Sequence, residues 1–366
     1  MAGFSPSSPL YASTINQRFK IKTAPISQKS VLMGGLESHG CIAYNKSGLR
    51  IEWRPEIRRD TIVTADPYRV RMVFDEPNPW VIAALDWCSF NRGVRIPKID
   101  RLANRGDEAF YNLVDTTVDR LAKNFIWSFA KKLYQDGTAD PKELQGLETI
   151  FATTGLVSGS PVGNPSGSYA GLSQALGGVG GSWDATGTWP HVGQGTPDFY
   201  AWSPMKVDYR NSMWTSAPYS AATATWFHTW RYALNFAYLN LGRLQDREPD
   251  VCIMPTNLFR QAEDSLVSTE KFEVTANSGL TKLGHKTVMF KGLELAHEFN
   301  CRPEGSAFLF DWENIELQSM QGQLLGFMQE ESIETSDQLK AADFYGQLII
   351  KVPGFMAQLA GITAGS

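Results

Sequence analysis

The strongest hydrophobic pattern in the chain lies between residues 107 and 137. Asp107 is suited to cap the start of a helix here, and Gly137 follows the last turn, where a left-handed residue is usual. The pattern predicts a helix of about 28 residues, roughly 42 Å long, which is near the upper end for a globular domain. Apolar residues recur at steps of three and four, on one helix face, at Phe110, Leu113, Val114, Val118, Leu121, Phe125, Ile126, Phe129 and Leu133.

A two-residue alternation predicts strands before that helix. Apolar and charged residues alternate over 49–53 and again over 70–74, and the segment 55–67 between them is polar. This pattern predicts a projecting hairpin whose apolar face needs a partner surface, because an isolated hairpin is only marginally stable. Whether that surface belongs to the same domain or to another subunit is left open by the pattern. Apolar runs at 80–85 and 93–97 lead back to the helix.

Residues 1–47 differ from both patterns. They are rich in Ser, Gln, Lys and Gly and show no sustained hydrophobic period. We expect an extended arm with little core of its own, which would be ordered by neighbouring subunits.

The second half of the chain mixes helices and strands. A stripe of apolar residues predicts a helix over 222–241 that ends at Gly242; the stripe consists of Trp226, Trp230, Leu234, Ala237 and Leu241. Residues 251–254 lie between two prolines and predict a short buried strand, after which Thr256 can cap a helix that reaches Leu266. Further strands are predicted over 288–294, 307–312 and 345–352.

Two short motifs carry a resemblance to a known family. The long helix ends in Leu133-Tyr134-x-Asp136-Gly137-Thr138, and Gly146-Leu147 follows. This arrangement resembles the spine helix of tailed-bacteriophage major capsid proteins with the Hong Kong phage-type fold. The segment with Tyr169, Gly171 and Leu172, followed by Trp183 or Trp189, resembles the entry to the axial domain of that family. The order of elements agrees over nearly the whole chain, although the stretch between Gly177 and Met213 is long for the family.

The resemblance implies an α+β fold with the family's domain order. The expected parts are an N-terminal arm at 1–47, an extended β-hairpin loop with return strands at 48–98, a peripheral domain with the spine helix at 99–147, an axial domain with an inserted loop at 148–335, and a return strand with the C-terminal tail at 336–366.

The resemblance also implies a function. A major capsid protein is made in the host cytoplasm, assembles into pentamers and hexamers of an icosahedral shell, and encloses double-stranded DNA in the virion without binding a particular sequence. Scaffold, portal and decoration proteins are its implied partners. The hairpin would then act as a clamp between subunits, with Arg54, Arg58 and Arg59 facing Glu330, Glu331 and Glu334 of a neighbour.

Composition and motifs point away from catalysis. The net charge of −4 is not that of a protein that grips nucleic acid with a basic face. The four cysteines are widely spaced, and the five histidines lack metal-ligand spacing, so we expect no zinc site and no dense disulfide frame. The glycine run at 177–181 lacks the Lys-Ser/Thr ending of a phosphate-binding loop. We expect no enzymatic activity, no cofactor, no signal peptide and no membrane span.

Two alternatives remain at this level. An encapsulin-type nanocompartment shell has the same fold, but it typically carries a short N-terminal helix in place of the arm, and residues 1–47 do not have a helical pattern. A soluble enzyme is the alternative from another class, because active sites assemble from residues that are distant in sequence. Small-molecule turnover by a chain of low oligomeric state would favour the enzyme.

Overall fold

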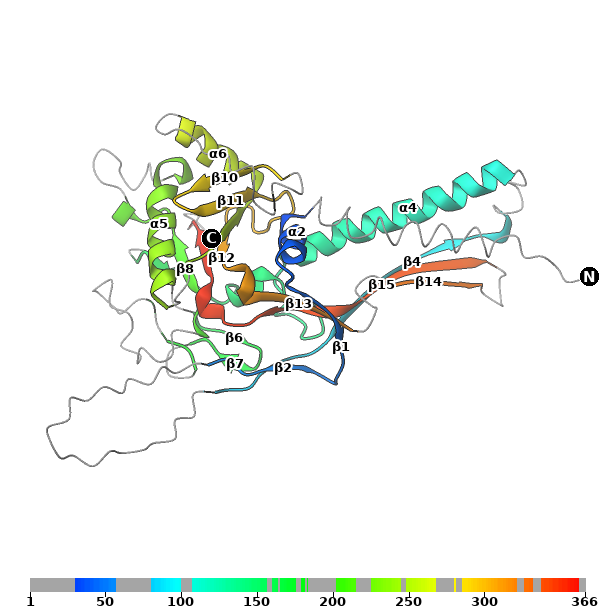
Figure 1. Ribbon diagram of the computed structural model, residues 1–366, viewed down its shortest axis with the longest axis horizontal. Coiled ribbons are helices and arrows are strands. Elements are labelled where there is room, and N and C mark those ends of the chain that lie inside the picture. The colour runs from blue at the N-terminus through cyan, green and yellow to red at the C-terminus, as the bar shows by residue number, and fades with distance from the viewer. Residues whose placement is uncertain are drawn as a thin grey trace, which may run out of the picture.

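The chain forms an elongated part and a broader lobe (Figure 1). The computed structural model describes residues 30–56, 80–99, 107–156, 160–163, 165–175, 179–181, 183, 202–214, 225–244, 248–267, 280, 285–320, 326–331 and 337–361. The elongated part contains α4 and a five-stranded sheet, and the lobe contains a seven-stranded sheet with α5 and α6.

The described residues contain four α-helices and four short 3-10 helices with assigned bounds. The α-helices are α2 (Val31–Ser38), α4 (Asp107–Lys132), α5 (Trp226–Leu244) and α6 (Thr256–Val267). The 3-10 helices are η1 (Leu147–Ile150), η3 (Ser212–Trp214), η5 (Trp312–Asn314) and η6 (Pro353–Phe355).

The strands are mostly short. The N-terminal ones are β1 (Ile42–Lys46), β2 (Ile51–Trp53), β3 (Ala83–Leu85), β4 (Cys88–Ile96), β5 (Val162–Gly163), β6 (Ser168–Tyr169), β7 (Leu172–Ser173) and β8 (Met205–Asp208). The C-terminal ones are β9 (Val251–Met254), β10 (Thr287–Phe290), β11 (Leu293–His297), β12 (Ala307–Phe310), β13 (Ile315–Met320), β14 (Gly326–Glu331), β15 (Gln338–Ile350) and β16 (Ala357–Ala360).

The long strand β15 organises the elongated part. It pairs antiparallel with β4, β13 and β14, and β1 joins the outer side of β13 in parallel. The sequence predicted only the C-terminal half of this strand, over 345–352. The strand begins at Gln338 instead, because its polar first half lies between β14 and β4 and is paired on both sides.

Helix α4 packs on this sheet through aromatic side chains. The ring centroid of Phe344 in β15 lies 4.8 Å from that of Phe90 in β4 and 4.9 Å from that of Phe129 in α4. Phe125 stacks on Phe90 at 5.4 Å. The predicted apolar stripe is therefore the packing face of α4, from Leu121 onward. The side chains of residues 107–116 are outside the described set.

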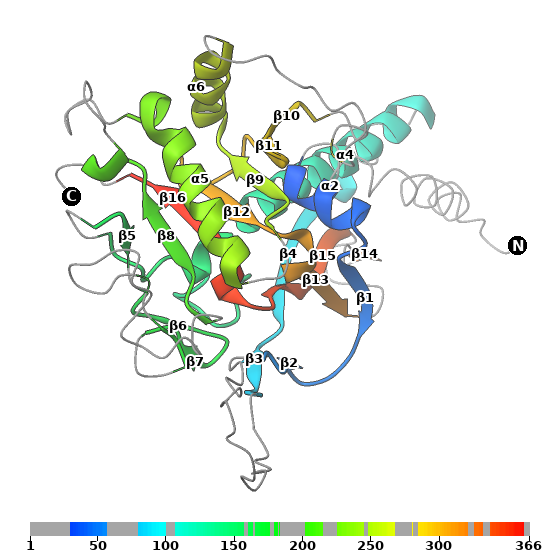
Figure 2. The same cartoon turned by 60° about the vertical axis from the view of Figure 1, so that its left-hand side comes forward.

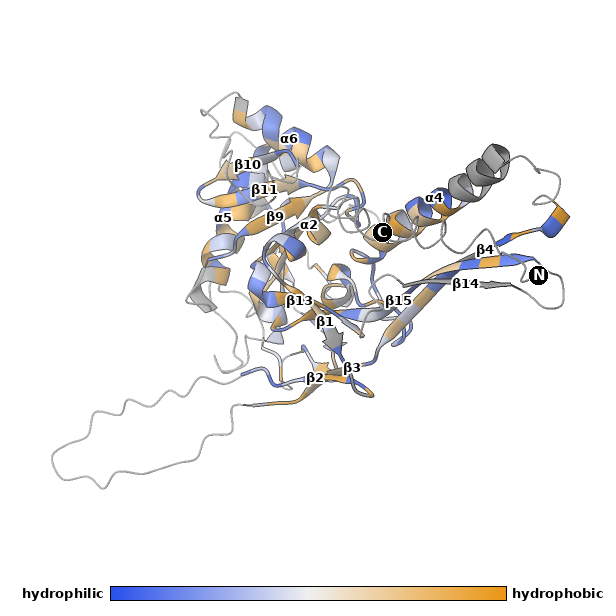
Figure 3. Cartoon of the chain, turned by 45° about the vertical axis from the view of Figure 1, so that its right-hand side comes forward, coloured by the Kyte–Doolittle hydropathy of each residue, from blue (hydrophilic) through white to orange (hydrophobic). Residues whose placement is uncertain are grey.

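The lobe is built around a mixed sheet in the order β10-β11-β9-β12-β16-β8-β5. The predicted buried strand at 251–254 is β9, and it is buried on both sides. Cys252 and Met254 face the α5 and α6 side, whereas Val251 and Ile253 face the core shared with α4. Figure 2 shows α5 lying across one face of this sheet, and Figure 3 shows β9 coloured as hydrophobic.

Two local predictions in the second half need correction. Helix α5 carries the predicted stripe, but it continues through Gly242 to Leu244. The predicted strand over 288–294 is two strands, β10 and β11. Lys291 and Gly292 join them with φ values of 52° and 89°, which is the left-handed pair that a tight two-residue hairpin turn requires.

The hairpin region is only partly as predicted. β2 pairs with β3 from the third apolar run, and a bridge between Glu56 and Trp80 extends the pair. Leu49 was expected in the first strand but is 92% exposed and lies outside β2. The strand predicted at 70–74 lies outside the described residues.

The prediction that residues 1–47 contribute little core is wrong for residues 31–38, which form α2. Val31, Leu32, Met33 and Leu36 of this helix are buried in the core shared with α4 and β15. The run is only eight residues long, too short to show a period in the sequence. Residues 1–29 lie outside the described part of the chain.

We predict that Phe129→Ala destabilises the subunit by about 3–5 kcal/mol, because Phe129 is 1% exposed and fills the contact between α4 and the sheet. Trp127→Ala on the outward face is the control and should change the stability by less than about 1 kcal/mol. Thermal unfolding of unassembled subunits measures both. If the Phe129→Ala subunit melts at the same temperature as the parent, Phe129 is not part of the stabilising core.

Candidate functional site

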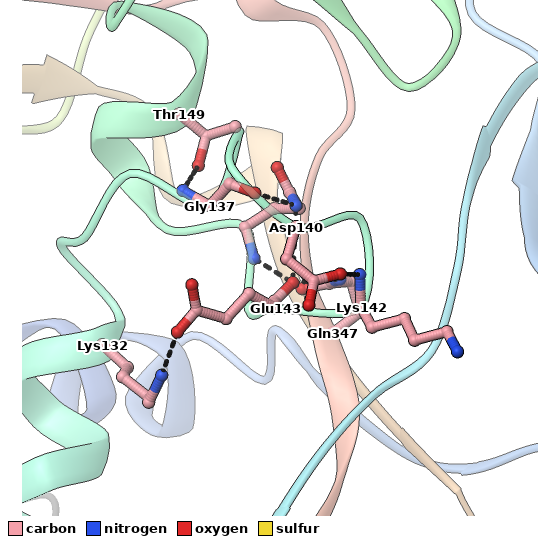
Figure 4. A network of polar contacts seen from close by, with 8 residues as sticks. Lys132, Gly137, Asp140, Lys142, Glu143, Thr149 and Gln347 are labelled. Atoms are coloured by element: carbon pink, nitrogen blue, oxygen red, sulfur yellow. Dashed lines mark hydrogen bonds and ion pairs between the residues drawn. The ribbon is translucent and has the colours of Figure 1, made fainter.

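The chain leaves α4 through a polar junction that joins the elongated part to the lobe (Figure 4). Lys132 at the helix end pairs with Glu143 at 2.5 Å. The backbone N–H of Gly137 donates to Thr149 Oγ1 at 3.0 Å, and Gln145 Nε2 donates to the carbonyl oxygen of Gly137 at 2.9 Å. Both backbone polar groups of Gly137 are therefore bonded to side chains that follow the turn in sequence.

Gln347 of β15 connects this turn to the five-stranded sheet. Its Oε1 accepts from the backbone N–H of Gln145 at 2.9 Å. Its Nε2 lies 3.1 Å from the carbonyl oxygen of Asp86 and 3.3 Å from that of Glu143. The side chain is fully buried, so these bonds replace those that water would make.

The Asp-Gly-Thr turn works through close approach rather than through a left-handed residue. Gly137 does not have a positive φ, so the predicted left-handed helix end is wrong. A Cβ atom at Gly137 would lie 2.6 Å from the carbonyl oxygen of Leu144, and one at Gly146 would overlap backbone atoms of Gln135. Asp136 Oδ1 accepts from the N–H of Thr138 at 2.9 Å and fixes the turn locally.

The second family-like motif is also a tight turn. Ala170 and Gly171 have φ values of 51° and 79° and join β6 to β7. The Tyr169 hydroxyl accepts from the N–H of Ile350 at 3.0 Å, which ties this hairpin to the end of β15. Trp183 is fully buried and donates to the carbonyl oxygen of Ser203 at 2.7 Å. Trp189 lies outside the described residues.

A charged cluster lies where η1 meets the lobe sheet. Residues alternate across β8 and β16, so Met205, Val207, Ala357 and Leu359 face α5. The intervening Lys206 and Gln358 are paired in register. Gln358 Nε2 donates to the carboxylate of Glu148 in η1, and Lys206 Nζ donates to the carbonyl oxygen of Phe151 at 3.3 Å.

Burial controls the acid–base behaviour of this cluster. It raises the pKa of Glu148 from 4.5 to about 7, although the nearby Lys206 charge and the Gln358 hydrogen bond act in the opposite direction. Asp136 adds to the increase. Burial also lowers the pKa of Lys206, opposed by Glu148. Gln358 Oε1 is buried and has no hydrogen-bond partner among the described residues.

The N-terminal helix α2 is held by two side chains from the C-terminal half. The buried Glu298 carboxylate accepts from the N–H of Val31 at 2.5 Å, at the positive end of the helix dipole. Burial raises the pKa of Glu298 despite hydrogen bonds from Val31 and its neighbours. The ring of Trp312 packs against Gly35, where a Cβ would overlap it, and stacks on His39 at 5.3 Å.

The predicted intersubunit residues are only partly described. Arg54 is exposed just after β2. Glu330 and Glu331 are in β14, where their backbones pair with Leu339 and Gln338, and their side chains are not described. Arg58, Arg59 and Glu334 lie outside the described residues. Figure 1 shows β2 and β14 well apart within one chain.

The described residues contain no group of three or more His, Cys, Asp or Glu side chains that could hold a metal ion. Among the helices in the same part of the chain, none is long and apolar enough to span a membrane.

Comparison with known proteins agrees with the architecture. No family model and no curated protein sequence matches the chain. The capsid asymmetric unit of cyanophage A-1(L) superposes with a TM-score of 0.58 and 15% identity, covering 90% of this chain and 92% of that chain. The capsid of the native GTA particle gives a TM-score of 0.53 and 10% identity, covering 90% of both chains.

The chain has the Hong Kong phage-type capsid fold. Identities this low establish a shared fold, and the residues above show how this sequence builds it. The mixed α+β architecture expected from the sequence is confirmed.

Within this capsid fold, two stabilising sites were not found from the sequence. Glu298 and Trp312 hold α2 from more than 250 positions away, and no local motif marks either one. Glu148 and Gln358 are likewise distant in sequence. A signal did exist for α2 itself, because Ser30 caps the apolar run that follows it.

We predict a specific pH dependence for Glu148. Its folded pKa of about 7 lies above the ordinary 4.5. The folded chain therefore keeps a proton that the unfolded chain has lost, and stability contributed by Glu148 falls as pH rises from about 4.5 to 7. The full effect corresponds to roughly 3 kcal/mol. Glu148→Gln mimics the neutral acid and should be more stable than the parent at pH 8, with little difference at pH 4.5.

Thermal melts of both proteins across this pH range provide the measurement. Glu298 titrates in the parent and in the variant alike, so the difference between the two curves reports Glu148 together with its charge coupling to Lys206. If the difference does not change with pH, Glu148 is ionised throughout and the assignment is wrong.

Proposed function

We propose that this chain is a structural major capsid protein that self-assembles into pentamers and hexamers of an icosahedral shell around a double-stranded DNA phage genome. The observation that carries the proposal is the likeness in fold to the cyanophage capsid subunit over 90% of this chain and 92% of that one. The order of elements also supports the proposal. The β2–β3 pair comes first, the long helix α4 on the five-stranded sheet follows, and the lobe comes after it.

In this proposal each part of the chain has the role expected from the sequence. The part around α4 and β15 acts as the peripheral domain; besides the expected 99–147 and 336–366 it includes β13 and β14 from the expected 148–335. The lobe acts as the axial domain at the centre of each ring, and its sheet adds β16 to the strands from 148–335. Contacts that repeat around a ring close it into pentamers or hexamers. The segment 48–98 reaches a neighbour. Of the expected arm at 1–47, residues 1–29, which precede α2, act as the arm.

The direct experiment is electron microscopy of the purified protein at high concentration, together with its sedimentation. Closed shells with fivefold and sixfold capsomers support the proposal. A species of one or a few chains at every concentration, especially with small-molecule turnover, would overturn it in favour of the soluble enzyme.

An encapsulin-type shell is the second candidate, and α2 is the observation that favours it. The helical segment at Val31–Ser38 removes part of the argument that the N-terminal region is not helical. The contents of purified shells distinguish the two functions. Nuclease-protected DNA supports the capsid, and a co-purifying cargo enzyme supports the encapsulin.

We predict that two N-terminal deletions behave differently. Removal of residues 1–29 should leave the subunit melting temperature unchanged but impair shell formation. Removal of residues 1–38 also removes α2, whose buried side chains contribute roughly 1.5–3 kcal/mol each, and should destabilise the subunit itself. Melting curves and sedimentation of both variants test this. Normal shells from the shorter deletion would show that residues 1–29 have no assembly role.

We also predict that Arg58→Glu together with Arg59→Glu slows or redirects assembly, more strongly at low salt. Each exposed ion pair contributes only about 0–1 kcal/mol, so the effect depends on many copies in one shell. Arg260→Glu, an exposed change on α6, is the control. Light scattering follows the kinetics, and rescue by Glu330→Arg with Glu331→Arg would identify the partner. Unchanged assembly kinetics at low salt would contradict the hypothesis that these arginines pair with acidic residues of a neighbouring subunit.

A further inference from the structure

The outward face of α4 carries a row of cations around one tryptophan. Arg120, Lys123, Asn124, Trp127 and Lys131 are all exposed. They recur at steps of three and four, so they lie on one side of the helix, opposite the buried stripe. Figure 3 shows hydrophobic and hydrophilic residues mixed along α4. The row from Arg120 to Lys131 is about 16 Å long.

This row is electrostatically unsatisfied within the described part of the chain. Arg120 and Lys123 form no ion pair with any described residue. Lys131 Nζ lies 5.9 Å from the ring centroid of Trp127, which is 56% exposed. Lys132, by contrast, points to the junction and pairs with Glu143. The row itself contains no acidic residue, but Asp119 lies one turn before Lys123 at the edge of the row. The whole chain has a net charge of −4.

We propose that this face of α4 contacts the phosphate backbone of the DNA that the shell encloses. The inference rests on the proposed capsid function, and it names the surface that meets the enclosed polyanion.

The chemistry of the row fits a duplex better than it fits a protein surface. Duplex DNA carries one negative charge per about 1.7 Å, so a straight row of this length faces several phosphates at any sequence and rotation. Lys and Arg bind phosphates without reading bases, which suits a shell that must accept an entire genome. A protein neighbour would instead have to supply acids at matching spacing and an apolar surface for Trp127. The Trp127 ring holds the Lys131 ammonium over its face, which keeps that cation on the row.

The test compares charge-neutralised variants that keep the helix. Arg120→Gln, Lys123→Gln and Lys131→Gln are combined in one protein, since Gln is a good helix former. The matched control combines Lys46→Gln, Lys142→Gln and Arg260→Gln, which are exposed and lie outside α4. Both proteins have the same net charge. Binding of unassembled subunits to a labelled random-sequence duplex is measured over a range of salt concentrations.

The parent and the control should bind with the same salt dependence. The α4 variant should lose affinity, and the slope of log K against log salt should fall in magnitude by about 2.7, because each phosphate contact contributes about 0.9. Binding by the α4 variant equal to that of the control would overturn the proposal. A second readout is ultraviolet cross-linking to the duplex, in which the tryptic peptide 124–131 with Trp127 should carry nucleotide.

Assembly without DNA tests the other explanation, that a neighbouring chain covers this face of α4. The α4 variant should form DNA-free shells as readily as the control does. Its failure to do so would show that a neighbouring chain covers the row, and would overturn the DNA contact. If the parent itself forms no shells, the proposed capsid function fails, and the duplex measurements still decide whether this face binds DNA.

Discussion

The structure depends on the lobe sheet being buried on both faces. β9 and β12 place one set of apolar side chains under α5 and α6 and the other set against the end of α4, α2 and the strand β15. These two strands therefore have no face left for water, and the segment that leaves α4 is buried against them at Gly137 and at residues 144–147, whereas residues 138–142 are exposed. Polar backbone groups in such a segment need protein partners. Gln145, Gln347 and Thr149 supply these partners, and Gly137 and Gly146 give the chain room to approach them.

Long periodic elements could be predicted from the sequence, whereas contacts between distant segments could not. The stripes of α4 and α5 and the apolar run of β9 are local patterns, and each forms the expected element. β15 was underestimated because its polar first half is stabilised by two neighbouring strands. The function of Gly137 was misjudged because a helix-end glycine usually supplies a left-handed φ, while this one permits a close contact with Leu144.

Contacts between subunits are harder still to predict from the sequence of one chain. Glu330 and Glu331 are on β14, which lies apart from β2 within one subunit, so a contact between them and Arg54 would have to come from a second copy of the chain. A sequence carries no direct record of such a contact. It does show where charges are concentrated, with arginines at 54, 58 and 59 and glutamates at 330, 331 and 334. Glu298 is a different case. Its partner, the N–H of Val31, belongs to the same chain but is more than 250 residues away in sequence.

The division between buried and outward residues explains how a fold can persist at 10–15% identity. Many apolar sets can fill the contact between a long helix and a sheet if size and pattern are kept. Phe90, Phe125, Phe129 and Phe344 are one such set. The outward residues are not constrained by this packing. The same helix can therefore hold the subunit together through Phe129 while Arg120, Lys123 and Lys131 on its outward face vary without disturbing that contact.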